Sequence, residues 1–198
     1  MPRNVIRLCV IALAMTPFSA SAHVGAGDTN SFVSGFPHPL AGVDHILAMI
    51  AVGLLAVHVG GRALWLLPLT FLSIMAIAGL LGAAGVWLPF VEMGIGMSVV
   101  VLGLAIAFQL TLPIAAAMGL VGFFAIFHGH IHGAEMADAV HGLTYGIGYL
   151  CATALLHATG IGFGTAIART GKQNSRRAVQ VSGYAMAMAG VAILAGVF

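Results

Sequence analysis

Residues 63–82 read ALWLLPLTFLSIMAIAGLLG and contain no charged side chain. An apolar stretch of about 20 residues is long enough to cross the hydrocarbon core of a bilayer as an α-helix. A helix is required because a spanning segment must satisfy its backbone hydrogen bonds within itself. The stretch therefore predicts a membrane-spanning helix.

The composition extends this prediction to most of the chain. Charged residues make up 6% of the 198 residues, against about 25% in ordinary soluble domains, and 61% of the residues are hydrophobic. Such a chain cannot supply the polar surface of a water-soluble fold, so we expect most of it to lie in lipid. The net charge of +2 gives no basis for binding nucleic acid. Cys9 and Cys151 form no CxxC pair, which argues against a thiolate metal site.

The hydropathy pattern predicts an all-α, polytopic membrane protein with a bundle of six transmembrane helices. The apolar segments cover approximately residues 42–59, 63–82, 90–109, 113–127 with a polar extension, 140–161 and 178–198. Clusters of Gly and Pro separate several of them, as expected for turns. We therefore expect residues 23–198 to form a single six-span domain.

Residues 1–22 have the three parts of a secretory signal peptide. Arg3 and Arg7 precede an apolar run over residues 8–15, and Ala20-Ser21-Ala22 provides a small-residue cleavage site. The apolar run is short for a membrane crossing, which favours a cleaved signal over an uncleaved first span. His23 would then begin the mature chain.

Charge placement predicts the orientation in the membrane. A cleaved signal leaves the mature N-terminus in the periplasm of a bacterial cell, so an even number of spans returns the C-terminus to the same side. The remaining positive charges then all face the cytoplasm, as the positive-inside rule requires. These charges are Arg62 and, in a predicted loop over residues 169–177, Arg169, Lys172, Arg176 and Arg177. The sequence thus predicts a multi-pass protein of the inner membrane.

Two short stretches concentrate polar side chains at the predicted periplasmic face. Residues 38–45 read HPLAGVDH, and residues 127–135 read FHGHIHGAE. Ionisable groups at membrane depth are costly and usually functional. Imidazole and carboxylate together suit a divalent transition metal better than Mg²⁺ or Ca²⁺. The stretches predict one metal site, whose expected ligands are His38, Asp44, His45, His128, His132 and Glu135.

Helical spacing sorts these candidates. His128, His132 and Glu135 are spaced i, i+4 and i+7 and share one face of a helix, whereas His130 points elsewhere. Asp44 has a structural alternative, because a carboxylate is also favoured near a helix N-terminus. Further candidates for the metal pathway are His23, Met49, Glu92, His130 and His141, although Met49 also suits a packed core. For His58 and His157, the sequence favours neither of two roles over the other: one is packing or an interfacial position, and the other is metal exit.

The two motifs resemble those of the HupE/UreJ family of nickel permeases, which are found beside hydrogenase and urease systems. The first motif is matched by His38, Pro39, Gly42, Asp44, His45 and Met49, and the second by Phe127, His128, Gly129, His132, Gly133 and Glu135. The chain departs from the family pattern at Ile131, where the family has a small Ala. The resemblance covers essentially the whole chain and implies uptake of Ni²⁺ across the inner membrane.

The expected function is therefore a secondary transporter for Ni²⁺, with Co²⁺ as a second candidate, and not an enzyme. Its expected partners are the metal ion and the lipid bilayer, with no permanently bound cofactor and no nucleic acid; a homo-oligomer is left open. One alternative is an intramembrane metal-dependent hydrolase with Glu135 as general base. Another is a haem-binding electron carrier with axial histidines.

Overall fold

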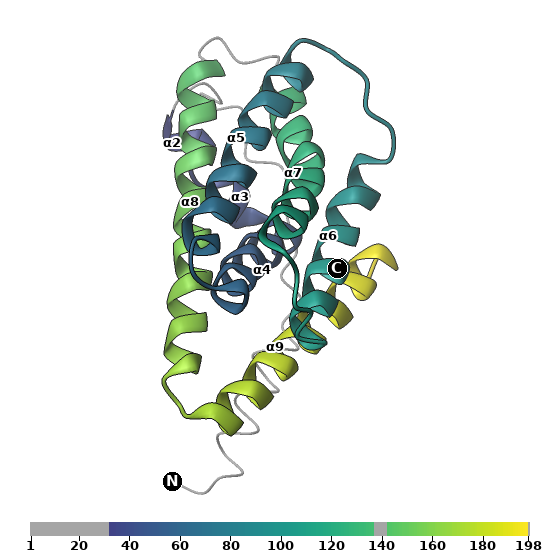
Figure 1. Ribbon diagram of the computed structural model, residues 1–198. Helices are drawn as coiled ribbons and strands as arrows, with labels where there is room; N and C mark the ends of the chain where they lie inside the picture. The colour runs from purple at the N-terminus through teal and green to yellow at the C-terminus, as the bar shows by residue number, and fades with distance from the viewer. Residues whose placement is uncertain (1–31, 137–141, 198) are drawn as a thin grey trace, which may run out of the picture.

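The computed structural model describes residues 32–136 and 142–197, and the regular elements within these ranges are all helices (Figure 1). Their bounds are α2 Phe32–Gly35, α3 His38–Ala41, α4 Val43–Val59, α5 Ala63–Ala83, α6 Val91–Ala107, α7 Ile114–Met136, α8 Gly142–Ala168 and α9 Lys172–Leu194. The prediction of an all-α fold is confirmed. The predicted signal peptide, residues 1–22, lies outside the described residues.

Four of the described helices, α5, α7, α8 and α9, are long and apolar enough to cross a membrane. A fifth candidate is the bent pair formed by residues 32–41 and α4, whereas α6 is a shorter apolar helix. Left-handed backbone at Phe90 and at Gln109, with φ of 58° and 51°, limits α6 at its two ends. The described residues thus form an all-helical structure with four or five candidate membrane spans, and the predicted total of six is not confirmed.

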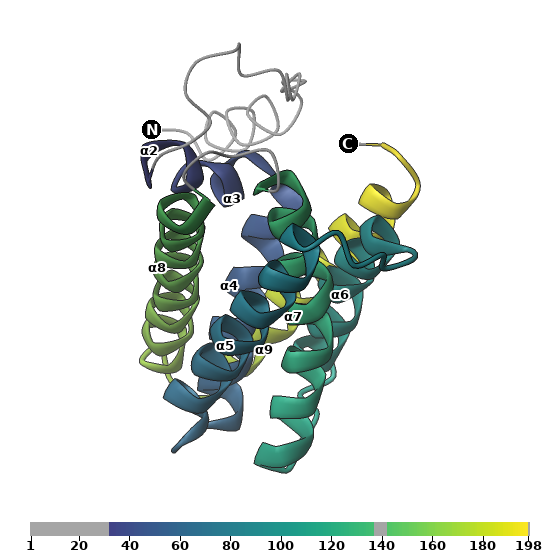
Figure 2. The same cartoon turned by 90° about the horizontal axis from the view of Figure 1, so that it is seen from above.

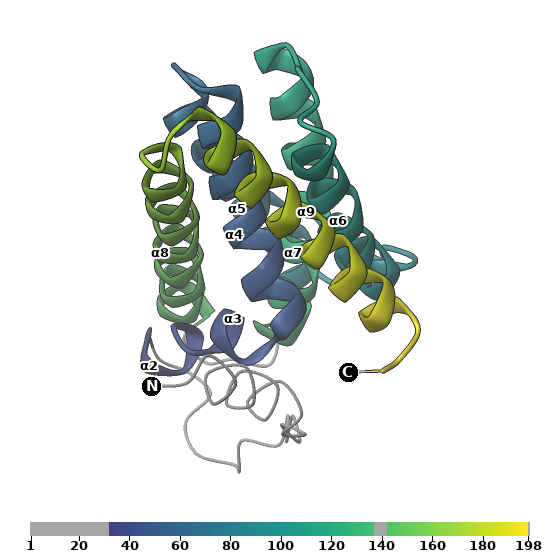
Figure 3. The same ribbon diagram turned by 90° about the horizontal axis from the view of Figure 1, so that it is seen from below.

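The predicted loop over residues 169–177 is mostly helical. The helix α9 begins at Lys172, directly after Gly171, whose φ of 92° permits a tight turn. Arg176 and Arg177 therefore lie in the first two turns of α9 and not in a loop. Figure 3 shows α9 crossing α6 obliquely on one side of the bundle.

Three pairs of long helices approach closely through glycine: α4 with α8, α5 with α7, and α6 with α9. In the second pair, a Cβ added at Gly129 would meet the backbone of Met75, and one at Gly133 would meet the backbone of Gly79. In the first pair, Gly53 faces the backbone of α8 at His157 in the same way. Small residues at these positions let backbones touch, as is common between helices in membranes.

The order of these contacts along each helix defines the two ends of the bundle. Residues 75 and 79 of α5 face residues 129 and 133 of α7, so these helices run parallel and their C-terminal ends lie together with the N-terminal end of α4. We call this the histidine end. The opposite end, here the arginine end, holds Arg62, Arg169, Arg176 and Arg177, where the amide of Gln109 donates to the Arg176 carbonyl.

A sharp bend at Gly42 positions the first motif. The segment over residues 32–41 meets α4 at 85°, and Figure 2 shows α2 and α3 lying across the N-terminal end of α8. Gly35 packs directly on the backbone of Tyr145 and holds this short arm against α8. The bend places His38 at the histidine end of the bundle, beyond the N-terminal end of α4, which carries His45.

The glycine contacts predict a specific stability effect. Gly133→Ala is expected to lower the free energy of unfolding by about 1–3 kcal/mol, because its Cβ would overlap the backbone of Gly79. Gly119→Ala in the same helix is the matched control, since a Cβ there meets nothing within 4 Å. Unfolding of both variants in mixed detergent micelles measures the difference. Equal stability of Gly133→Ala and the native chain would contradict the packing described here.

Candidate metal centre

Four histidines from three helices form a continuous line of rings at the histidine end. The ring centroids of His38 and His132 are 4.9 Å apart, those of His132 and His45 are 4.8 Å apart, and those of His45 and His128 are 4.9 Å apart. We call these four residues the histidine row. His38 comes from α3, His45 from α4, and His128 and His132 from α7. The bend at Gly42 and the helical spacing of α7 together create this arrangement.

The outer end of the row contains two histidines and a carboxylate. His38 Nε2 lies 2.7 Å from Glu135 Oε2, and His132 Nδ1 lies 3.7 Å from the same oxygen. Possible ligand atoms of these three residues all lie within 4.8 Å of one another. The Glu135 side chain is 45% exposed and His132 is 1% exposed, so this group connects the surface with the interior. It has the donor types that bind a divalent transition metal.

Asp44 fixes the orientation of His45. The carboxylate oxygen Oδ1 accepts from the backbone amide of His45 at 2.7 Å and lies 2.8 Å from His45 Nδ1. Because an ionised carboxylate only accepts, the hydrogen of the neutral ring is on Nδ1. The lone pair is then on Nε2, which is buried and has no hydrogen-bond partner in the described part of the chain. A carboxylate that orients a histidine in this way is a common feature of metal sites.

Ser98 of α6 fixes the orientation of His128. The Ser98 hydroxyl donates to the carbonyl of Ile95 at 2.6 Å, so its oxygen accepts from His128 Nε2 at 3.0 Å. The hydrogen of the neutral ring is therefore on Nε2, and the lone pair is on Nδ1. This Nδ1 atom is also buried, and the residues described offer it no partner. Sequence reasoning missed Ser98, whose only signal is a hydroxyl within an apolar helix.

Two tyrosines of α8 complete the walls of the site and were also missed. The ring of Tyr149 stacks on His132, with centroids 5.0 Å apart, and the ring of Tyr145 lies 5.9 Å from that of His38. Both tyrosines are almost fully buried. They pack against the outer two imidazoles from α8.

The buried nitrogens of the row are chemically unusual. In the described structure, His45 Nε2, His128 Nδ1 and both ring nitrogens of His132 have no hydrogen-bond partner. An unpaired polar atom in an apolar interior costs about 1–3 kcal/mol on protein scales. Neutral imidazole nitrogens with free lone pairs are suited to transition metals. The row places several such nitrogens next to one another.

Of the other predicted candidates, the structure describes Met49, Glu92 and His130. Met49 is fully buried in the apolar core, and Glu92 is exposed at the start of α6. His130 lies against the loop after α5, where its Nε2 donates to the carbonyl of Val86 at 2.6 Å. His23 and His141 lie outside the described residues.

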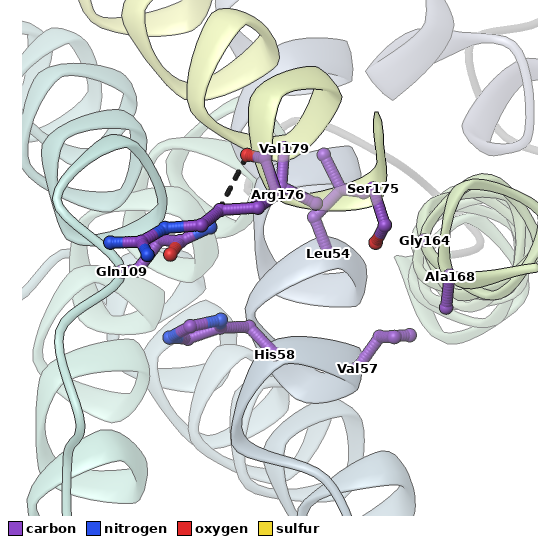
Figure 4. Close-up of a pocket in the computed structure, with 9 residues that line it drawn as sticks. All are labelled: Leu54, Val57, His58, Gln109, Gly164, Ala168, Ser175, Arg176 and Val179. Carbon is purple, nitrogen blue, oxygen red and sulfur yellow. Dashed lines mark hydrogen bonds between the residues drawn. The ribbon is translucent and has the colours of Figure 1, made fainter. Parts of the chain in front are cut away.

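A cavity opens at the arginine end, away from the row (Figure 4). It has a volume of about 510 Å³ and is lined by residues of α4, α8 and α9 together with Gln109. Figure 4 shows His58, Gln109 and Arg176 along one side of it. The ring nitrogen Nε2 of His58 donates to the carbonyl of Leu110 at 3.2 Å.

Comparison with known proteins identifies the family of the chain. Residues 11–193 match the family described as HupE / UreJ protein. The chain is 43% identical over 196 residues to Protein HupE from Rhizobium leguminosarum bv. viciae, an alignment that covers 99% of this chain and 100% of that protein. No solved structure matches the chain. With the family match over nearly its whole length and a relative of this similarity, the chain belongs to the HupE/UreJ family.

Proposed function

We propose that this protein is a permease that takes up a divalent transition metal ion, Ni²⁺ first and Co²⁺ second, through the histidine row. The observation that carries the proposal is the line of buried, unpaired imidazole nitrogens between the exposed Glu135 and the protein interior. Membership of a family of hydrogenase and urease accessory proteins supports nickel as the cargo. The family match also favours transport over the hydrolase alternative.

Capture begins at the half-exposed pair of His38 and Glu135. Their facing atoms are 2.7 Å apart, a hydrogen-bond distance, so a proton is shared between two atoms that can both bind a metal ion. An arriving cation displaces this proton to the surrounding water and is held by the imidazole, the carboxylate and its own remaining water. The negative charge of Glu135 offsets part of the cost of removing water from a divalent ion.

Transfer inward proceeds by exchange of one imidazole ligand for the next. Neighbouring rings of the row are 4.8–4.9 Å apart, so an ion bound to one ring is close to the next. His132 passes the ion to His45 and His128, whose lone pairs are oriented by Asp44 and Ser98. Binding at each position must be strong enough to select the ion and weak enough to release it.

The placement of the positive charges supports a proposed orientation in the membrane. The arginines of the described chain lie at the end opposite the row, and positive charge at the cytoplasmic side is the general rule. The proposed orientation in the inner membrane therefore has the histidine row facing the periplasm, with both mature termini on that side.

One prediction from the proposed function concerns His132, at the centre of the outer group. His132→Ala is expected to reduce uptake of radiolabelled nickel, at limiting metal, to the level of cells without the protein. The variant removes a ring that contacts both His38 and His45, so the row is broken. The matched control is His130→Gln in the same helix, because the His130 ring faces the carbonyl of Val86 and not the row.

Full uptake by His132→Ala, with the protein present in the membrane at native level, would exclude this assignment. Loss of uptake in both histidine variants would instead show that any change in this part of α7 is harmful.

Another prediction from the proposed function concerns Asp44, which is proposed to orient His45. Asp44→Asn keeps the shape of the side chain and loses its negative charge. Its amide can turn an N–H toward His45 Nδ1, which reverses the ring tautomer. Metal affinity is expected to fall by about 10–100-fold, as is typical when a residue that orients a metal-binding histidine is changed. Titration of the purified protein with Co²⁺ measures this loss, and an unchanged affinity would limit Asp44 to a role at the helix N-terminus.

A further inference from the structure

His157 of α8 is a buried histidine that the proposed capture site does not use. It is 1% exposed, and neither of its ring nitrogens has a hydrogen-bond partner among the described residues. It lies near the middle of α8. A leucine or phenylalanine would fill the same space without leaving two polar atoms unpaired, so packing alone does not account for imidazole here.

Thr153 lies one turn before His157 on the same face of α8 and has a related property. Its side chain is fully buried, and within the described structure its hydroxyl has no partner. A threonine within a helix usually donates to a backbone carbonyl of the preceding turn. Thr159 of the same helix does so, donating to Leu155 at 2.8 Å. The free hydroxyl of Thr153 therefore adds a second unused donor and acceptor beside His157.

The ring of Phe71 connects this position with the histidine row. Its centroid lies 5.6 Å from that of His128 and 5.1 Å from that of His157. His157 is thus the next imidazole beyond the row, separated from His128 by one aromatic ring.

His157 also lies between the row and the cavity at the arginine end. Along α8 it follows Tyr149, which stacks on His132, by eight residues, and it precedes Gly164, which lines the cavity, by seven. At 1.5 Å per residue these separations are about 12 Å and about 10 Å. Helical spacing puts His157, Gly164 and Ala168 on one face of α8. Figure 4 shows the last two of these on the wall of the cavity.

We propose that His157 and Thr153 form a second, inner binding station for the same divalent metal ion, between the histidine row and the cavity. This inference rests on the proposed transport function. An imidazole nitrogen and a hydroxyl oxygen give fewer and weaker ligands than the outer group, so the station holds the ion briefly and releases it toward the cavity. The cavity, which is open, lets the ion regain water before it leaves.

The test measures Co²⁺ binding by the purified protein and metal uptake into proteoliposomes. The native chain is expected to show one tight site and one weaker site. Thr153→Val, which keeps the shape of the side chain, is expected to weaken the second site by about tenfold, at the low end of effects seen around metal ligands. His157→Leu is expected to abolish the second site, keep the tight one and slow uptake. Thr159→Val is the matched control, because its hydroxyl already bonds to the backbone.

Unchanged uptake and unchanged cobalt binding in Thr153→Val and His157→Leu would overturn the inner station. If His157→Leu does not accumulate in the membrane, cobalt binding and uptake by Thr153→Val alone decide whether the inner station exists. His157→Gln distinguishes a bound metal ion from a buried water, because its amide can still hydrogen-bond to water. If this variant takes up metal at the native rate, and neither it nor the native chain shows a second cobalt site, these groups hold a buried water and the station is overturned. Failure of the proposed function looks different, because the native chain would then bind no cobalt at the tight site and transport none.

Discussion

The contact between the backbones of α5 and α7 determines the rest of the site. Gly129 and Gly133 lie against Met75 and Gly79 with no room for a Cβ, which fixes both the depth and the rotation of α7. Each histidine of α7 in the row is adjacent in sequence to one of these glycines, so its ring is directed into the bundle. In lipid, where helices gain little from burying apolar surface against one another, such close contact is a main source of association.

Helical geometry alone predicts part of this site. The spacing of His128, His132 and Glu135 correctly indicated a common face, because α7 remains helical as far as Met136. The neighbourhood of His38 depends on the 85° bend at Gly42 and on packing against α8, so local sequence gives only the break and not its direction. Ser98 and Tyr149 reach the row from other helices, and their roles depend on tertiary contacts that no local pattern encodes.

Other differences from the sequence analysis have local causes. Polar composition suggested a loop over residues 169–177, yet the helix starts at Lys172 because Gly171 completes a turn of only three residues, 169–171. The third predicted span is shorter than expected, since Phe90 and Gln109 adopt left-handed backbone at its ends. Hydropathy identifies apolar segments well, but the exact ends depend on these single backbone angles.

The two tautomers in the row have a mechanical consequence. His128 offers its lone pair through Nδ1, which is two bonds from Cβ, whereas His45 offers Nε2 at the far side of its ring. Rotation about the Cα–Cβ bond moves Nε2 further than Nδ1, because Nε2 lies further along the side chain, so this rotation displaces the free lone pair of His45 more than that of His128. On the proposed path, an ion that passes from His45 to His128 therefore meets first the ligand atom that this rotation moves further and then the one that it moves less.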